Sequence, residues 1–376
     1  MLSKPKTDGD SIPILKALLP ESSDLIPFLK KIDGSSRYSN FGPLSLEFEN
    51  SLSELYQDLV GDGASCLVVS NGTAGLTLAL KELELPPKSG VLVPAFTFVA
   101  TALAVKAAGH VPIACDIDVN TWLLTPESIE PTIRNLKKSI PLKAVVPVSI
   151  FGATQDIRIW DAFYRRTGIK VVIDAAASFG NQTASEEVTT VFSLHATKPL
   201  SCGEGGAIFS KSPNRLDRLR KLSNFGFGMK NTGLGYNCKI SEFTAAVGLA
   251  AALHFKADAK KRRALYENLK NKLSGQTEAV FEFQNIKTPF APSIFCLKAQ
   301  SEAHREAVEQ NCWSQNIETR RWYLPLLQSH SALDEIKVPV ETPNADQLAR
   351  RLFGIPFFPA MQDEEIDKVL ACVTNT

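Results

Sequence analysis

Short apolar runs alternate with amphipathic, helix-like segments between residues 66 and 210. The runs are rich in valine, isoleucine and leucine and predict strands over Cys66–Ser70, Gly90–Pro94, His110–Cys115, Ala144–Ile150, Lys170–Ile173, Val191–Leu194 and Ala207–Ser210. Between them, apolar residues at helical spacing predict helices over Ala74–Glu84, Phe98–Ala108, Glu127–Lys138 and Ile157–Thr167. Apolar strands that alternate with helices predict a mainly parallel sheet covered on both faces.

The pattern differs on either side of this region. The first 45 residues contain many turn formers and little periodicity, and an amphipathic helix is expected over Leu44–Val60. Beyond residue 212 one long helix is expected over Ile240–Ser274. The remainder is expected to form strands over Ser293–Leu297 and Gly354–Pro356 and helices near 302–312, 344–352 and 363–373. We therefore expect two units: residues 1–250 form a large α/β domain with an N-terminal extension, and residues 251–376 form a smaller α+β domain.

The composition narrows the class of protein. The chain has 376 residues, of which 44% are hydrophobic and 22% charged, and its formal net charge is +1. These proportions are typical of soluble globular proteins. The balanced charge offers no electrostatic basis for binding nucleic acid or an anionic membrane, and no apolar run reaches the ~20 residues of a membrane span. Residues 1–11 lack the apolar stretch of a signal peptide.

Cysteine and histidine spacing gives no sign of a metal site. No pair among the seven cysteines has CxxC spacing, and the five histidines form no HExxH motif. An odd number of cysteines scattered through apolar stretches favours reduced, structural thiols and a cytoplasmic location.

Three polar segments follow predicted strands, at the edge where open α/β sheets bind ligands. The turn 71–73, Asn-Gly-Thr, opens a helix, so its amides can either receive a phosphate or serve only as a helix cap. Asp174 ends a strand. Its carboxylate could pair with a cation, act as a base, bind a metal ion or cap a helix. Lys198 lies between apolar stretches. Burial would lower its pKa and make the amine nucleophilic, and the alternative is a surface lysine.

Together these segments suit pyridoxal 5′-phosphate (PLP) better than each does alone. A lysine can bond covalently to the cofactor, an aspartate can keep its pyridine nitrogen protonated, and a helix N-terminus can hold its phosphate. Phe98 follows another strand and either offers an aromatic face to the ring or belongs to the core. Spacing alone does not identify the cofactor.

Nine motifs occur in order across most of the chain, at Asn40–Pro43, Ser70–Ala74, Pro94–Thr101, Asp174–Ala176, Ser193–Lys198, Gly203–Gly206, Gly235–Glu242, Tyr323–Leu326 and Ile355–Phe357. This set resembles the DegT/DnrJ/EryC1/StrS family of sugar aminotransferases. The resemblance implies the PLP-dependent aspartate aminotransferase fold (fold type I), with a large mainly parallel-sheet domain and a smaller C-terminal α+β domain. It also implies a homodimer whose active sites lie at the subunit interface.

The resemblance implies a role for each matching residue. Lys198 would bond to the cofactor and, once freed, carry a proton between substrate and cofactor. Asp174 would pair with the pyridine nitrogen, and Phe98 would stack on the ring. Asn237 would reach the cofactor phosphate of the partner subunit. The residues implied to bind the phosphate within one subunit are Gly72, Thr73 and Ser193.

The family moves an amino group from L-glutamate to a keto group of a nucleotide-linked sugar, for deoxyaminosugars and surface polysaccharides such as O-antigen. His195 and the short loop 198–206 resemble the branch that aminates C4 of 4-keto-6-deoxyhexoses, so amination at C4 is expected. The expected substrate is a dTDP-linked sugar, and UDP- and GDP-linked sugars remain open. The alternative is amination at C3. The residues considered for substrate binding are His195, Lys230, Arg320, Arg321 and Tyr323; for the charged ones, solvated surface charge is the alternative.

Two positions depart from the family pattern. Ala177 stands where many relatives have a glutamine that contacts the cofactor, and Lys239 stands where many have arginine. A dehydratase and a regulatory protein are alternatives to transamination that the residues disfavour. Related dehydratases have histidine in place of the lysine that bonds to the cofactor, so Lys198 argues against that activity. A PLP-binding regulatory protein without turnover is disfavoured because Lys198, Asp174 and Ser193 are all present.

Overall fold

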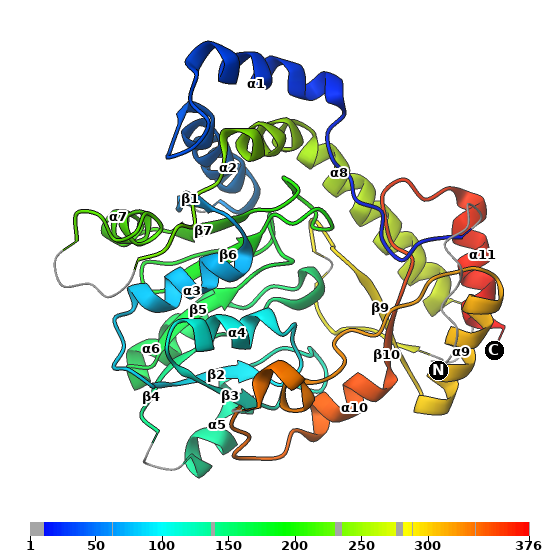
Figure 1. The fold of residues 1–376 in the computed structure, drawn as a ribbon. Coiled ribbons are helices and arrows are strands. Elements are labelled where there is room, and N and C mark those ends of the chain that lie inside the picture. Colours follow the sequence, from blue (N-terminus) through cyan, green and yellow to red (C-terminus); the bar gives the residue numbers. More distant parts are fainter. Residues whose placement is uncertain are drawn as a thin grey trace.

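The computed structural model describes residues 11–61, 63–136, 140–229, 235–275, 281–287, 289–334 and 336–375. A seven-stranded sheet forms the centre of the larger part, in the order β1-β7-β6-β5-β4-β2-β3 (Figure 1). Its strands are β1 (Ser65–Val69), β2 (Gly90–Pro94), β3 (Val111–Cys115), β4 (Leu142–Val145), β5 (Lys170–Asp174), β6 (Thr189–Ser193) and β7 (Gly206–Ser210). β7 is antiparallel to β1 and β6, and the other neighbouring strands pair in parallel. The predicted mainly parallel sheet is confirmed.

Helices cover both faces of this sheet. One face packs against α2 (Pro43–Val60), α5 (Pro126–Asn135), α6 (Ile157–Thr167) and α8 (Glu242–Ser274). The other packs against α3 (Gly72–Glu82), α4 (Ala100–Ala107) and α7 (Pro213–Leu222). Successive strand residues alternate between the two layers: Leu92 belongs to the first, and Val91 and Val93 belong to the second. Burial on both faces explains why the strands are apolar throughout.

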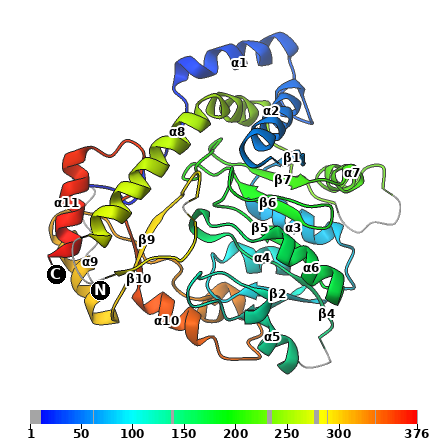
Figure 2. The ribbon, with the colours of Figure 1, turned by 180° about the vertical axis from the view of Figure 1, so that it is seen from behind.

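A second, smaller part contains an antiparallel three-stranded sheet in the order β10-β9-β8. Its elements are β8 (Phe281–Glu282), β9 (Phe295–Ala299), α9 (Glu302–Ser314), α10 (Pro343–Arg351), β10 (Leu352–Ile355) and α11 (Asp363–Thr374). Figures 1 and 2 show α8 extending from α2 beside the large sheet to α11 in the smaller part. This α+β part agrees with the predicted fold. Because α8 passes through residues 250 and 251, the domain boundary placed there stays a prediction.

No helix is predicted before Leu44, but α1 spans Ser22–Ser35. This helix contains Pro27, and Ile32 is its one buried residue among those that the structure describes. Leu25, Phe28, Leu29 and Ile32 have helical spacing, so the sequence does carry a signal for this helix. Packing against α8 supplies the stabilisation that the local sequence lacks.

Two predicted boundaries are wrong beside the large sheet. The strand expected over Ala144–Ile150 ends at Val145, and the chain then turns through Phe151 and Gly152 at φ 59° and 99°. The helix expected from Phe98 begins at Ala100. Both shifts leave residues in turns at the edge of the sheet, where their side chains or backbone can face a ligand.

Three further observations concern possible membrane helices, metal sites and disulfides. Within the described ranges, no helix has both the length and the apolar character that a bilayer span requires. In the same part of the chain, no three histidine, cysteine or acidic side chains gather as a metal site. All seven cysteines are free thiols.

Candidate active site

A pocket lies at the edge of the large sheet where β1, β5 and β6 end. The segment that leads into β9 and the segment 320–323 of the smaller part complete its walls. Nine of the twelve residues considered from the sequence line it: Gly72, Thr73, Phe98, Asp174, Ser193, His195, Lys198, Arg320 and Tyr323. Residues separated by up to 251 positions in the chain therefore meet in one site.

The N-terminus of α3 forms one side of the pocket. Asn71 caps the helix by accepting a hydrogen bond from the amide of Ala74 at 2.8 Å. Gly72 lies against the end of β6, where a Cβ atom would be 3.1 Å from Cβ of Ser193. A Cβ atom on Gly206 would lie 2.6 Å from the carbonyl of Asn71. Glycines thus bring this helix end close to Ser193, and helix N-termini favour anions such as phosphate.

Asp174 is a buried carboxylate, 4% exposed, at the end of β5. Its oxygens accept hydrogen bonds from the hydroxyl of Thr101 at 2.7 Å and from the amide of Ala176 at 3.1 Å. Burial raises the pKa of Asp174, although these hydrogen bonds and the charge of Lys198 oppose the shift. Burial lowers the pKa of Lys198, and the charge of Asp174 opposes this. The pocket therefore holds a lysine amine that loses its proton more readily than an exposed lysine.

His195 lies in the tight loop between β6 and β7. Its Nδ1 is 3.0 Å from the hydroxyl of Thr197, and its Nε2 is 3.7 Å from a carboxylate oxygen of Glu204. The amide of Lys198 donates to the carbonyl of His195 at 2.8 Å. The same short loop therefore orients both His195 and Lys198 at the pocket.

Aromatic rings form another wall. Tyr323 stacks on Phe151 at 5.6 Å between ring centroids and meets Phe96 edge-on at 5.4 Å. Phe98 is 58% exposed, and its ring centroid is 6.3 Å from that of Tyr323. Burial raises the pKa of Tyr323. The phenol therefore stays protonated and can donate a hydrogen bond.

Three residues considered from the sequence do not line this pocket. Arg321 donates to the carbonyl of Ala349 instead. Asn237 is exposed outside it, and its proposed contact with a partner's cofactor stays a prediction. Lys230 lies outside the described residues. The two departures from the family pattern are both visible: Ala177 lines the pocket, and the amine of Lys239 hydrogen bonds to Asn224 at 2.8 Å.

Sequence reasoning missed several residues at the site. Thr101 contacts Asp174 directly, and its hydroxyl is 3.1 Å from that of Thr97. Both threonines belong to the motif 94–101, although Thr97 precedes α4. Ser293 also lines the pocket, and its buried hydroxyl has no hydrogen-bond partner among the described residues. No local sequence pattern distinguishes Ser293.

The family of the chain follows from comparison with known proteins. A model of the DegT/DnrJ/EryC1/StrS aminotransferase family matches residues 21–374. The chain belongs to this family. Its members are PLP-dependent sugar aminotransferases, so the protein is a PLP-dependent aminotransferase.

Individual relatives agree with this membership. The chain is 28% identical to UDP-2-acetamido-2-deoxy-3-oxo-D-glucuronate aminotransferase of Pseudomonas aeruginosa, over 89% of this chain and 91% of that protein. Among solved structures, a putative PLP-dependent aminotransferase from Bacillus cereus is 27% identical with a TM-score of 0.85, covering 96% of this chain and 99% of that one. A family member from Brucella abortus is 23% identical with a TM-score of 0.82, covering 94% and 95%, and shows the shared fold. Fold type I is confirmed.

The residues of the pocket fit the cofactor of the family. Lys198 offers an amine, Asp174 a buried carboxylate, and the N-terminus of α3 beside Ser193 a site for an anion. When bound, PLP supplies an electron sink for a substrate carbon that loses a proton. Ala176 and Ala177 add small side chains that leave space beside Asp174.

Thr101→Val is expected to slow the reaction with glutamate about tenfold. The variant keeps the shape of the side chain but removes the 2.7 Å hydrogen bond to Asp174, which favours the charged carboxylate. Single-turnover kinetics of the holoenzyme with glutamate measure the effect. Thr190→Val is the matched control, since Thr190 is another buried threonine, hydrogen bonded to the carbonyl of Thr183. Equal rates in the two variants would contradict the role given to Thr101.

Proposed function

We propose that this enzyme transfers the amino group of L-glutamate to the C4 keto group of a nucleotide-linked 4-keto-6-deoxyhexose, with dTDP-4-keto-6-deoxyglucose as the preferred acceptor. The observation that carries the proposal is a single pocket that combines Lys198 and Asp174 with the N-terminus of α3 and with His195. The first three features suit a PLP-dependent transamination, and His195 with its short loop supports the C4 position.

In this proposal Lys198 and Asp174 carry the chemistry. Lys198 would hold the cofactor through its amine and would also move the proton at the substrate carbon. Its lowered pKa suits both tasks, because a neutral amine can act as nucleophile and as base. Asp174, held by Thr101, would pair with the pyridine nitrogen. Phe98 would offer its face to the ring, and the residues proposed to hold the phosphate are Gly72, Thr73 and Ser193.

The remaining pocket residues are proposed to bind the acceptor. Arg320 is exposed at the pocket, and its planar guanidinium suits a diphosphate. Tyr323 offers an aromatic face and a protonated hydroxyl, which suit a sugar ring. His195, held by Thr197 at 3.0 Å, is placed to contact the sugar near the reacting carbon.

Amination of a 3-keto sugar is the second candidate. The relative from Pseudomonas aeruginosa is named for a UDP-linked 3-oxo sugar and matches 89% of this chain at 28% identity. We rank C4 above C3 because His195 and the short loop after Lys198 resemble the C4 branch.

We further propose that the enzyme works as a homodimer in the cytoplasm. The amine of Lys239 lies 4.7 Å from the ring centroid of Phe225, which in turn contacts Phe227. Both rings are more than half exposed, and a second subunit would cover them. Asn237 of each subunit would then reach the cofactor phosphate of the other. The seven free thiols support a reducing compartment.

Product analysis tests this function. The holoenzyme is incubated with L-glutamate and either dTDP-4-keto-6-deoxyglucose or a UDP-linked 3-keto sugar, and the products are examined by nuclear magnetic resonance. The expected result is a new amine at C4 of the dTDP sugar. Reaction with the 3-keto sugar alone would favour the second candidate. Failure of glutamate to react at all would contradict transamination with this donor.

A further inference from the structure

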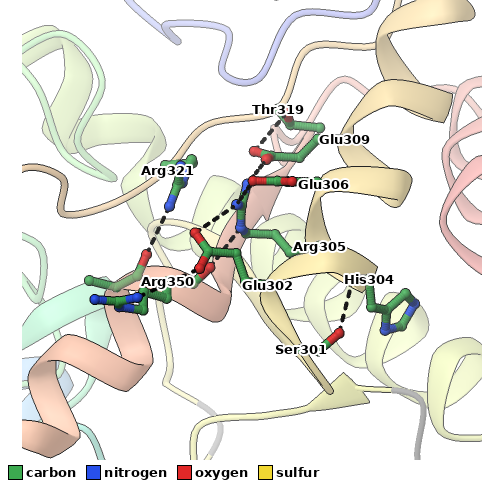
Figure 3. A network of polar contacts seen from close by, with 10 residues as sticks. Ser301, Glu302, His304, Arg305, Glu306, Glu309, Thr319, Arg321 and Arg350 are labelled. Carbon is green, nitrogen blue, oxygen red and sulfur yellow. Dashed lines mark hydrogen bonds and ion pairs between the residues drawn. The ribbon is translucent and has the colours of Figure 1, made fainter.

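A buried arginine on α9 lies at the centre of an ion-pair network in the smaller part of the molecule (Figure 3). The side chains of Arg305 and Glu309 are 1% and 2% exposed, and they are paired through Nη1 of the arginine and Oε2 of the glutamate. Arg305 also contacts Glu306 at 2.9 Å and Glu302 at 3.6 Å, and its Nε donates to the carbonyl of Arg350 at 2.7 Å. The guanidinium is therefore fixed from several directions.

This network extends to the segment that leads into the pocket. The hydroxyl of Thr319 donates to Glu309 at 3.4 Å and accepts a hydrogen bond from the indole of Trp313 at 2.9 Å. Arg321 donates to the carbonyl of Ala349 at 3.3 Å, and the charges of Arg305 and Glu309 both act on it. Thr319 and Arg321 are thus both held on the α9 and α10 side of the segment.

Arg320, between these two residues, lines the pocket instead. Alternate residues of an extended segment point to opposite sides, so fixing Thr319 and Arg321 also fixes the direction of Arg320. The backbone of Arg320 pairs with Gly354 of β10 in both directions, at 3.2 and 2.7 Å. The Arg320 guanidinium lies 5.5 Å from the ring centroid of Trp322, and a Cβ atom on Gly354 would come within 2.2 Å of that indole.

We propose that the buried Arg305–Glu309 pair positions Arg320 for the anionic part of the acceptor, acting through Thr319 and Arg321. Arg305 and Glu309 are positioning residues, since neither lines the pocket. This inference rests on the proposed function, in which Arg320 binds the diphosphate. Because desolvation offsets much of the attraction in a buried ion pair, stability alone is a weak account of such a network, whereas its fixed geometry can hold a neighbouring segment in place.

The test compares Glu309→Gln with a matched variant, Glu82→Gln, in the full-length holoenzyme. The Glu82 side chain is also 2% exposed and pairs with two arginines, Arg215 and Arg218, but it lies between α3 and α7, away from the pocket. Glu309→Gln is expected to raise KM for dTDP-4-keto-6-deoxyglucose about tenfold, with kcat and the visible absorption of bound PLP within about twofold of wild type. Glu82→Gln is expected to lower Tm without raising KM.

Hydrogen exchange gives a readout that needs no turnover. The amides of Arg320 and Gly354 are expected to exchange several-fold faster in Glu309→Gln than in wild type. In Glu82→Gln their exchange is expected to match that of wild type. If wild type does not aminate the keto sugar, the proposed function fails, and hydrogen exchange alone then decides the positioning role. Unchanged KM in an active Glu309→Gln enzyme, or unchanged exchange, would overturn the inference and leave the proposed function intact.

A milder variant covers the case in which Glu309→Gln does not fold. Thr319→Val removes the hydroxyl that joins Trp313 and Glu309 but leaves the buried ion pair complete. It is expected to raise KM about threefold with kcat unchanged. A Thr319→Val enzyme with wild-type KM and wild-type exchange at Arg320 would also overturn the inference.

Discussion

Lys198→Arg is expected to lower turnover by more than about 10³-fold. A guanidinium stays protonated at any pH the protein tolerates, so it can neither bond to the cofactor nor take a proton from the substrate. The visible absorption of lysine-bound PLP is expected to disappear with the activity. Absorption spectra of the reconstituted protein and initial rates with glutamate and the keto sugar measure both effects.

Lys170→Arg is the matched control. Lys170 is a half-buried lysine at the start of β5, and its amine is 2.6 Å from the hydroxyl of Tyr164, outside the pocket. Its replacement is expected to leave spectrum and rate within about twofold of wild type. Turnover by Lys198→Arg at a rate near that of Lys170→Arg would mean that another group bonds to the cofactor.

Asp174→Ala is expected to slow transamination by about 10²-fold or more while changing PLP affinity much less. In the proposed function the carboxylate would stabilise positive charge on the pyridine nitrogen, and this charge would matter most when the substrate carbon has lost its proton. Asp174→Asn separates charge from shape, because it keeps the size of the side chain and can still accept from Thr101. It is expected to lose nearly as much activity as Asp174→Ala.

Asp116→Asn serves as the control for removing a carboxylate. Asp116 accepts hydrogen bonds from the amides of Asn344 and Ala345 at the start of α10, outside the pocket. Its replacement is expected to affect stability rather than the rate of the reaction with glutamate. If Asp174→Asn retained full activity, a charge at Asp174 would not be needed.

The order of strands and helices could be predicted because strands that are buried on both faces are apolar at successive positions. The same reasoning placed Asp174 and Ser193 at strand ends, and the structure brings both into one pocket. α1 was missed although Leu25, Phe28, Leu29 and Ile32 have helical spacing. The end of β4 at Val145 could not be predicted, because the apolar residues that follow it, such as Val148 and Ile150, are buried outside the strand.

In the candidate site, too, some residues could be recognised in the sequence and others could not. Lys198 and the turn at Gly72 are recognisable because each sits in a short motif with its own chemistry. Thr101 and Arg305 are not, because their importance depends on partners 73 and 45 residues away, Asp174 and the carbonyl of Arg350, which only the folded chain brings within hydrogen-bond distance. Arg320 was considered only as a charge of the right kind, and its direction toward the pocket depends on Gly354 of another element.

Borohydride reduction followed by peptide mass spectrometry tests the central claim most directly. After incubation with PLP, reduction is expected to fix the cofactor on the peptide that contains Lys198. Prior addition of excess L-glutamate is expected to remove most of this label, because Lys198 is freed when the amino group is transferred. Labelling of other lysines without Lys198, or labelling of Lys198 that glutamate leaves unchanged, would contradict the account.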